Sequence, residues 1–246
     1  MIEIENIYKS FNHRGVLNGV SLTVQKGEIL AVIGGSGVGK SVLLKHITGL
    51  IRPDRGTIKV DGQDVTMLRG KPLVRYRERV GFLFQGGALF DSMTVFENVA
   101  FPLREKTKLP EKKIRESVYD ILGHVGMQDD GEKFPAELSG GMQKRAALAR
   151  ALITNPEIML FDEPTTGLDP IIDNSVFKYI RSTHQQIGFT GIIVTHKIPK
   201  IFTLVQKVAL LSKGVIVATG TPDEVRQSTD PRVEYFLSGG ETGNNS

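Results

Sequence analysis

The sequence predicts an α/β protein with a mixed, mainly parallel sheet, a smaller antiparallel sheet and a helical subdomain. Along most of the chain, short apolar runs bounded by Gly or Asp alternate with stretches of helical periodicity, which is typical of buried parallel strands joined by helices. Near the N-terminus apolar residues alternate with polar ones instead, as in strands with one solvated face. Between residues 94 and 152 the periodicity is helical.

The strands with one solvated face are expected at residues 2–7, 16–24 and 56–60. The last of them runs into Asp61-Gly62, a dipeptide favoured in two-residue hairpin turns. Five other runs are short and aliphatic, without polar alternation, and therefore predict strands that are buried on both faces. These runs lie at residues 29–33, 80–84, 158–161, 191–195 and 208–211.

Helices are expected between the strands at 80–84 and 158–161. One begins at Pro110-Glu111, and another follows Ser139-Gly140-Gly141, where alanines recur at helical spacing. We therefore expect one domain over residues 1–237, in which a helical subdomain over about 92–152 is inserted into a core formed by about 1–91 and 153–237. Residues 238–246 are rich in Gly, Asn and Ser, and they are expected to be disordered.

Composition excludes several classes of protein. The chain has 246 residues, of which 40 % are hydrophobic and 24 % charged, so wholesale disorder is excluded. It has no cysteine, which excludes a disulfide framework, Cys-ligated zinc and a thiol nucleophile. The N-terminus lacks the layout of a signal peptide, and no apolar run approaches the roughly 18 residues that span a bilayer. We expect a cytoplasmic protein that reaches a membrane through a partner or its surface.

A glycine-rich loop follows the buried strand at 29–33 and precedes a helix. Its residues match the pattern G-x-x-x-x-G-K-[ST], in which successive backbone N–H groups and a helix N-terminus surround a phosphate. Lys40 is predicted to bridge the β- and γ-phosphates of a nucleotide, and the hydroxyl of Ser41 to coordinate Mg²⁺. The alternative is a turn that binds nothing, but it gives a lysine in the loop no use. The loop consists of Gly34, Gly35, Ser36, Gly37, Val38, Gly39, Lys40 and Ser41.

Two carboxylates follow the buried strand at 158–161. A strand of this kind delivers its C-terminal residues to the ligand-binding edge of an open α/β sheet. Asp162 is predicted to hold Mg²⁺, through water, and Glu163 to polarise the attacking water. Taken alone, two acids after a strand are more often a helix N-cap. The glycine-rich loop favours the catalytic interpretation, because a site for Mg²⁺ and a nucleotide needs such an acid.

A second candidate anion site opens the Ala-rich helix. The segment Leu138-Ser139-Gly140-Gly141-Met142-Gln143-Lys144-Arg145 places a serine and two glycines at a helix N-terminus. A single triphosphate does not need two such sites in one domain. We therefore expect a homodimer, in which Ser139, Gly140 and Gly141 of one protomer close over the γ-phosphate that the other protomer binds.

With this order of motifs, the chain resembles the nucleotide-binding subunits of ATP-binding-cassette (ABC) transporters over essentially its whole length. The resemblance implies a P-loop NTPase fold with a RecA-like core, ATP and Mg²⁺ as cofactors, and ATP hydrolysis coupled to transport. Phe11 matches the aromatic residue that stacks on adenine, and Gln85 the glutamine that senses Mg²⁺ and the attacking water. Asp169, in Gly167-Leu168-Asp169, matches a residue at the dimer interface, and His196 the histidine that contacts the γ-phosphate.

The resemblance thus implies Glu163, His196, Gln85 and Lys40 as the catalytic residues, and Ser41, Gln85 and Asp162 as those that meet the metal. One departure from the family pattern is visible, because Met142 stands where the family usually has Gln. Hydrolysis is expected to survive, since Ser139 and Gly141 are kept.

Residues 84–105 and 230–237, together with Met142, resemble the ATPases of Mce-type lipid transporters, which handle phospholipid between the inner and outer membranes of Gram-negative bacteria. This resemblance implies an integral membrane permease, a periplasmic Mce-domain protein and phospholipid as indirect cargo, and it allows a small cytoplasmic accessory subunit. The chain would then be peripheral, at the cytoplasmic face of the inner membrane. An ATPase of another permease and a soluble ABC ATPase in cofactor assembly remain as alternatives.

Two basic clusters, at residues 69–79 and 106–115, are interpreted as solvated helix faces. Attraction to anionic lipid head groups beside the permease remains as the alternative. A single aromatic residue, Tyr76, lies among these charges, which is not the interleaved pattern typical of stacking on nucleic acid, so no nucleic-acid partner is expected.

Overall fold

The computed structural model describes residues 1–168 and 170–240, which fall into two compact units. The first unit is formed by Met1–Arg77 and the segment that begins at Thr190, and the second by Glu78–Phe189. The fold class is α/β, as predicted. Asp169 and residues 241–246 of the predicted tail lie outside the described residues. In the part of the chain that is described, no helix has the length and apolarity needed to cross a bilayer.

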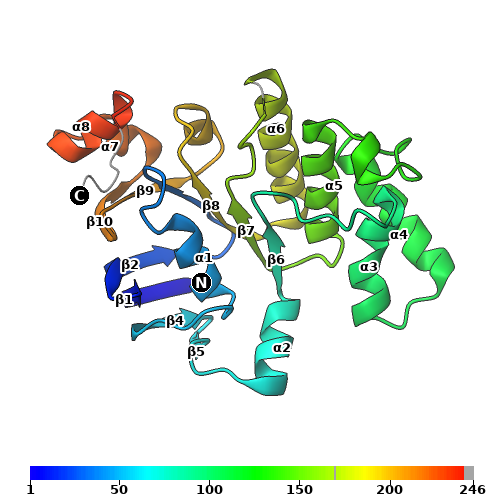
Figure 1. The fold of residues 1–246 in the computed structure, drawn as a ribbon, viewed down its shortest axis with the longest axis horizontal. Helices are drawn as coiled ribbons and strands as arrows, with labels where there is room; N and C mark the ends of the chain where they lie inside the picture. Colours follow the sequence, from blue (N-terminus) through cyan, green and yellow to red (C-terminus); the bar gives the residue numbers. More distant parts are fainter. Residues whose placement is uncertain (169, 241–246) are drawn as a thin grey trace. The chain divides into compact units, whose positions relative to one another are not determined.

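The antiparallel sheet of the first unit has the strand order β2-β1-β4-β5 (Figure 1). The predicted hairpin turn is confirmed, because Asp61 and Gly62 have φ values of 49° and 80° and join the paired residues Val60 and Gln63. A second tight turn, at Asn12 and His13, was not predicted and extends the first strand beyond its expected end. The strands are β1 (Ile2–Phe11), β2 (Arg14–Val24), β4 (Arg55–Val60) and β5 (Gln63–Asp64).

The other sheet of the first unit is mixed, with the order β10-β9-β3-β8. Strand β3 pairs in parallel with both β8 and β9, whereas β10 runs antiparallel to β9. All residues of β3 and β8 are buried, which explains their continuous aliphatic sequences. The strands are β3 (Ile29–Ile33), β8 (Thr190–Thr195), β9 (Lys207–Ser212) and β10 (Val215–Gly220), of which β10 was not predicted.

The helices of the first unit include the one that follows the glycine-rich loop. Helix α1 begins at Lys40 and buries Leu43, Leu44 and Ile47, which belong to the core together with β3. At the C-terminal end, the backbone N–H groups of residues 238–240 donate to carbonyls of α8. The helices are α1 (Lys40–Ile47), α2 (Gly70–Glu78), η2 (Lys200–Thr203), α7 (Pro222–Arg226) and α8 (Pro231–Leu237).

The second unit contains the expected helices and one parallel strand pair. Strand β6 (Val80–Leu83) pairs with β7 (Ile158–Asp162). Helix α4 begins at Glu111, as predicted, and Thr94 closes a capping box at the start of α3. The long helix α6 was not predicted. The helices are α3 (Val95–Lys106), α4 (Glu111–His124), η1 (Pro135–Glu137), α5 (Gly140–Leu152) and α6 (Pro170–Ile187).

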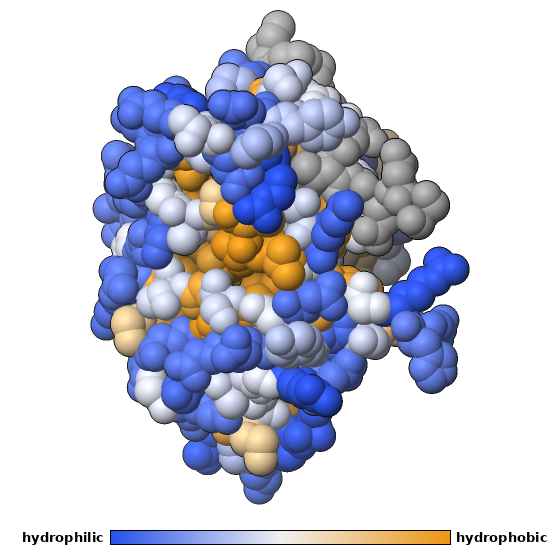
Figure 2. All heavy atoms as spheres, turned by 90° about the vertical axis from the view of Figure 1, so that its left-hand side faces the viewer, coloured by the Kyte–Doolittle hydropathy of each residue, from blue (hydrophilic) through white to orange (hydrophobic). Residues whose placement is uncertain are grey.

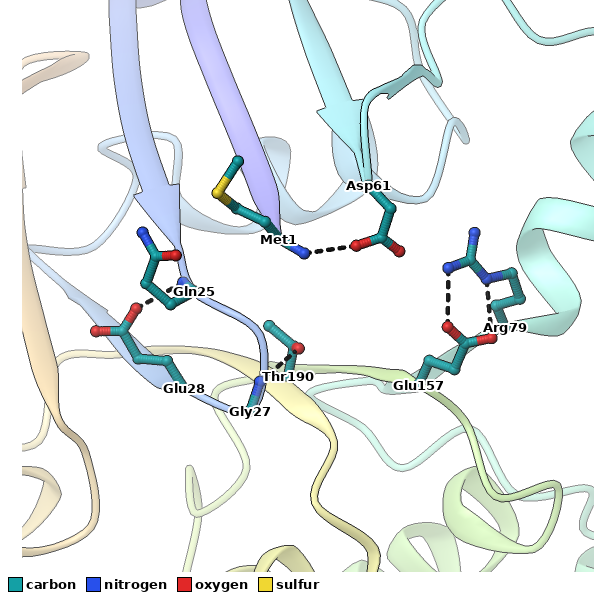
Figure 3. Close-up of polar contacts among 8 residues, drawn as sticks. All are labelled: Met1, Gln25, Gly27, Glu28, Asp61, Arg79, Glu157 and Thr190. Atoms are coloured by element: carbon teal, nitrogen blue, oxygen red, sulfur yellow. Dashed lines mark hydrogen bonds and ion pairs between the residues drawn. The ribbon is translucent and has the colours of Figure 1, made fainter.

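Polar contacts hold the starts of several strands, as Figure 3 shows. In the first unit, the N–H of Gly27 donates to Thr190 Oγ1 over 3.0 Å, next to the parallel pair β3 and β8. In the second unit, Arg79 forms two hydrogen bonds, of 3.0 and 2.8 Å, with the carboxylate of Glu157. Arg77 donates to the carbonyl of Gly49 over 2.9 Å. The interpretation of residues 69–79 as a solvated face is therefore wrong for these two arginines, which bind neighbouring segments.

Candidate nucleotide site

The phosphate loop lies between β3 and α1 in the first unit. Lys40 is only 6 % exposed, and its Nζ donates to the carbonyls of Gly34 and Gly35 over 2.8 and 2.9 Å. The ammonium therefore lies over its own loop, beside the first turn of α1. Gly39 precedes the helix with φ 106° and provides no side-chain cap. A helix start with this arrangement is a favourable place for an anion, because N–H dipoles and a lysine charge act together.

Steric crowding explains why glycine occupies both ends of the phosphate loop. A Cβ at Gly34 would lie 2.3 Å from the carbonyl oxygen of Leu211, and one at Gly39 would lie 2.8 Å from a methyl of Leu17. Both ends of the loop are thus packed against neighbouring strands. At Gly37, where φ is 75°, a Cβ would meet nothing within 4 Å. The loop is held at its ends and open in its middle, a shape that fits a phosphate group approaching the backbone.

The loop shares a cavity of about 260 Å³ with His196. His196 follows β8 directly, just as the loop follows β3, and these two strands are parallel neighbours. The carboxyl ends of parallel strands meet at the same edge of a sheet, which is where α/β proteins bind ligands. The end of α8 and the residues after it complete the wall. The lining residues are Gly35, Ser36, His196, Ile198, Phe236, Leu237, Gly239 and Gly240.

Phe11 ends strand β1 and has 44 % of its surface exposed. The ammonium of Lys9 lies 5.4 Å from the centre of its ring. Apolar side chains also reach the surface on the side of β1, β2 and β10 (Figure 2). Val16 of β2 and Val215 of β10 are half-buried. An exposed aromatic ring near apolar surface is suited to stacking on a planar ligand.

The acid pair stands at the end of β7 in the second unit, and both carboxylates are buried. Glu163 has φ 48°, in the left-handed region, which non-glycine residues rarely adopt. The hydroxyl of Thr166 donates to Glu163 Oε2 over 3.2 Å and orients that carboxylate. Strained residues of this kind cluster at functional sites, so the conformation supports the assignment of Glu163 to the chemistry.

Lys144 is a residue that the sequence interpretation did not single out. It lies on helix α5, is 7 % exposed, and donates from Nζ to the carbonyl oxygen of Gln85. Burial lowers the pKa of Lys144, and the negative charges of Asp162 and Glu163 oppose that shift. The signal in the sequence was a lysine on the buried face of the Ala-rich helix, at helical spacing from Gly141 and Leu148.

Ser139 is the N-cap of α5, where its Oγ accepts a hydrogen bond of 3.3 Å from the N–H of Met142. Met142 thus takes part in the helix start through its backbone, which is independent of its side chain. Gln143 donates to the carbonyl of Pro135 over 3.0 Å and holds the preceding segment. Residues of the chain itself therefore hold the N-terminus of α5 in place without a ligand.

The predicted site residues fall into two groups. Phe11, the loop at residues 34–41 and His196 belong to the first unit, where the cavity joins part of the loop to His196. The second unit contains Gln85, residues 139–141 and the acid pair, where Lys144 links Gln85 to the helix that begins after Ser139. Asp169 lies outside the described residues.

Sequence comparison places these features in a known family. Residues 17–166 match the family described as ABC transporter. The chain is 40 % identical to the intermembrane phospholipid transport system ATP-binding protein MlaF of Haemophilus influenzae, over 99 % of this chain and 92 % of that protein. It is 39 % identical to MlaF of Escherichia coli K12, over 97 % and 89 %. It is 43 % identical to the probable ribonucleotide transport ATP-binding protein mkl of Mycobacterium tuberculosis H37Rv, over 98 % and 67 %.

Solved structures give the same result. A dimeric post-hydrolysis state of the ATP-binding cassette MJ0796, bound to ADP and Pi, superposes with a TM-score of 0.83 at 29 % identity, over 90 % of this chain and 99 % of that one. The cbiO1 protein of Clostridium perfringens, part of the ABC transporter complex cbiONQ, superposes with a TM-score of 0.85 at 30 % identity, over 96 % and 94 %. On these matches, and on the motifs described above, the chain belongs to the ABC transporter family and is one of its cassette ATPases.

Proposed function

We propose that this chain is the ATPase subunit of an Mla-type transporter, which moves phospholipid between the inner and outer membranes. The similarity to MlaF of two organisms carries the proposal, because it extends over almost all of this chain and over 92 % and 89 % of those proteins. The chain spans 67 % of mkl, which has further sequence outside the match. Correspondence over nearly the whole of both chains supports phospholipid as the cargo over the ribonucleotide in the mkl name.

In this proposal the phosphate loop binds the phosphates of ATP, and Phe11 stacks on the adenine. In the presence of ATP, Lys40 exchanges the carbonyls of Gly34 and Gly35, to which it donates here, for phosphate oxygens. The residue types at Ser41, Gln85 and Asp162 fit Mg²⁺, which prefers oxygen ligands and keeps part of its water shell. When bound, Mg²⁺ would neutralise charge on the phosphates.

Glu163 polarises the attacking water and takes up its proton, while His196 donates to the γ-phosphate. The proposal is supported by the burial of the Glu163 carboxylate and by its hydrogen bond from Thr166, which hold that carboxylate in one orientation. The shared cavity of His196 with Gly35 and Ser36 supports the contact of His196 with the same phosphate that the loop holds.

Two copies of the chain are proposed to close head to tail, with Ser139, Gly140 and Gly141 of each protomer reaching the γ-phosphate of the other and Asp169 at the interface. The dimeric state of a structural neighbour that contains ADP and Pi supports this arrangement. The partners proposed are an integral membrane permease, a periplasmic Mce-domain protein and a small cytoplasmic accessory subunit. The ATPase would lie at the cytoplasmic face of the inner membrane, with phospholipid as indirect cargo.

The test is affinity purification of the tagged full-length chain from detergent-solubilised membranes of its host, with proteins identified by mass spectrometry and lipids extracted from the same sample. An untagged strain, processed in parallel, is the control. We expect a polytopic permease, an Mce-domain protein and phospholipid, all enriched over the control.

Two results would contradict the proposal. A different permease, without an Mce-domain protein or bound phospholipid, would keep the ATP-driven motor but replace the cargo. Recovery of the chain without any membrane protein would point to a soluble ABC ATPase, such as one acting in cofactor assembly.

A further inference from the structure

The glutamine loop, which we define as residues 84–90, lies directly on helix α5. Gly87 faces this helix, because a Cβ there would lie 3.4 Å from the Cβ of Ala147, at van der Waals distance. Two side chains of α5 donate to the backbone carbonyls of the loop: Lys144 to Gln85, and Arg150 to Gly87 and Ala88, the latter two over 2.8 and 2.7 Å. Cationic donors are strong partners for carbonyl groups. Helix α5 therefore holds the loop at three carbonyls, those of Gln85, Gly87 and Ala88.

Lys144 differs from Arg150 in what surrounds it. It is almost fully buried, and burying an ammonium costs several kcal/mol unless charges and acceptors compensate. The compensation here comes from the Gln85 carbonyl and from the negative charges of Asp162 and Glu163. One side chain thus interacts with the loop of Gln85 and with the acid pair. It is also fixed on the helix whose first turn carries Gly140 and Gly141.

We propose that Lys144 is a positioning residue that sets the place of Gln85 relative to the acid pair and ties both to the start of α5. This inference rests on the roles of Gln85 and Glu163 in the proposed function. The hydrogen bond from Lys144 fixes the backbone of Gln85, which is an exposed residue. The Cα position from which the Gln85 side chain extends is therefore defined. Because Lys144 lies on the same helix, a movement at the N-terminus of α5 would reach Gln85 through the buried contact between Lys144 and the Gln85 carbonyl.

The experiment is a double-mutant cycle of Lys144→Met and Gln85→Ala in the full-length chain, together with the subunits that co-purify with it. Phosphate release is measured against ATP and against Mg²⁺ concentration. Methionine keeps the length of lysine and removes the charge and the donor. We expect Lys144→Met to lower kcat at least about tenfold with KM for ATP changed less than about threefold, because the phosphate loop belongs to the other unit.

The double variant is expected to have the kcat of Gln85→Ala alone, since a residue that acts through Gln85 has nothing left to position. The Mg²⁺ concentration that half-saturates the rate is expected to rise in both Lys144→Met and Gln85→Ala. Lys144→Arg should recover most of the rate. The matched control is Lys113→Met, at an exposed lysine of α4 in the same unit, which should leave all these values unchanged.

Three outcomes would overturn the inference: a wild-type rate in Lys144→Met, full additivity with Gln85→Ala, or an unchanged Mg²⁺ dependence despite a lower rate. If Lys144→Met does not fold, as judged by thermal unfolding, Lys144→Gln enters the same cycle, because it removes the charge but keeps a donor. A parallel Glu163→Gln variant distinguishes failure of the proposed ATPase site from failure of the proposed role of Lys144. Retained turnover in that variant would remove the proposed site, whereas an inactive Glu163→Gln beside a wild-type Lys144→Met would remove only the inference about Lys144.

Discussion

Glu163 adopts a left-handed backbone conformation, with φ 48°, directly after the buried strand β7. A non-glycine residue in such a conformation costs of the order of 1–3 kcal/mol, and it persists only where surrounding contacts hold it. This conformation turns the chain immediately after Asp162. The side chains of Asp162 and Glu163 are therefore attached to backbone of different conformation, extended at Asp162 and left-handed at Glu163. Thr166, hydrogen-bonded to Glu163, is one of the contacts that hold the turn. Two adjacent acids can therefore take separate roles.

Lys40→Ala is expected to weaken ATP binding at least about tenfold, because it removes a buried ammonium from the phosphate loop. Isothermal titration of the purified chain with ATP and Mg²⁺ measures the change. Lys45→Ala, at an exposed position of the same helix, is the matched control and should bind as the wild type does. Equal affinities for wild type and Lys40→Ala would remove the loop from the nucleotide site.

Phe11→Ala should raise the KM for ATP by about 2- to 10-fold and leave kcat nearly unchanged, because stacking of an aromatic ring is worth roughly 0.5–1.5 kcal/mol. Steady-state phosphate release over a range of ATP concentrations gives both constants. Tyr8→Ala, which removes another exposed aromatic ring of β1, serves as the control. An unaltered KM in Phe11→Ala would mean that the adenine lies elsewhere.

At the scale of elements, α1 contains a buried histidine that makes the first unit sensitive to pH. His46 is 1 % exposed, with Nδ1 2.7 Å from the carbonyl of Val42, and its Nε2 is buried without a hydrogen-bond partner. Burial lowers the pKa of His46 and the carbonyl of Val42 opposes the shift, while Lys9 lowers it further and Asp54 raises it. The folded protein therefore resists protonation of this ring.

A group with a lowered pKa in the folded state stabilises the fold above its unfolded pKa of about 6.5, and that contribution is lost as pH falls toward the folded pKa. Thermal unfolding of the wild type should therefore shift to lower temperature between pH 7 and pH 5. In His46→Met, whose side chain does not titrate, the shift should be smaller. If both proteins respond to pH equally, His46 is not the cause.

Helix α5 makes contacts along its whole length, beyond the motif at its N-terminus. Its first turn carries the Ser139 cap, its next turn carries Lys144, and its last turn carries Arg150, which holds the glutamine loop. A helix is stiff along its axis, so these three contacts move together. Ala147, which lies between Lys144 and Arg150, faces Gly87 of the same loop.

For the whole molecule, the proposed head-to-tail dimer is expected to accumulate when hydrolysis is blocked. Glu163→Gln is expected to lower phosphate release by at least about 100-fold, the contribution of a general base, while ATP binding persists. Because ATP then remains in the site, a dimer should accumulate when ATP and Mg²⁺ are added. Phosphate release and multi-angle light scattering measure the two effects.

Glu157→Gln is the control for this variant, since Glu157 lies just before the same strand and pairs with Arg79 at its far end (Figure 3). It should hydrolyse ATP and show no trapped dimer. Steady-state hydrolysis at the wild-type rate in Glu163→Gln would refute its role as the general base.

Strands and turns that are specified by residues adjacent in the chain could be predicted from the sequence. Continuous aliphatic runs identified β3, β7, β8 and β9, and Asp61-Gly62 identified a hairpin whose positive φ angles suit these residues. Helix α6 was missed, although Val176, Phe177 and Ile180 are buried at helical spacing, because it follows the acid pair without a recognised start. The extension of β1 to Phe11 was missed because a register shift near Asn6 interrupts its alternation.

The sequence by itself determined the α/β class, the phosphate loop, the acid pair and the family, because each of these is written in residues that are contiguous or follow in a set order. Tertiary structure alone decided that His196 and Gly35 line one cavity and that Lys144 binds the carbonyl of Gln85. The physical reason is distance along the chain. A contact between residues far apart in sequence depends on which strands pair and on which segment packs against a helix face, and no local pattern of residues encodes either.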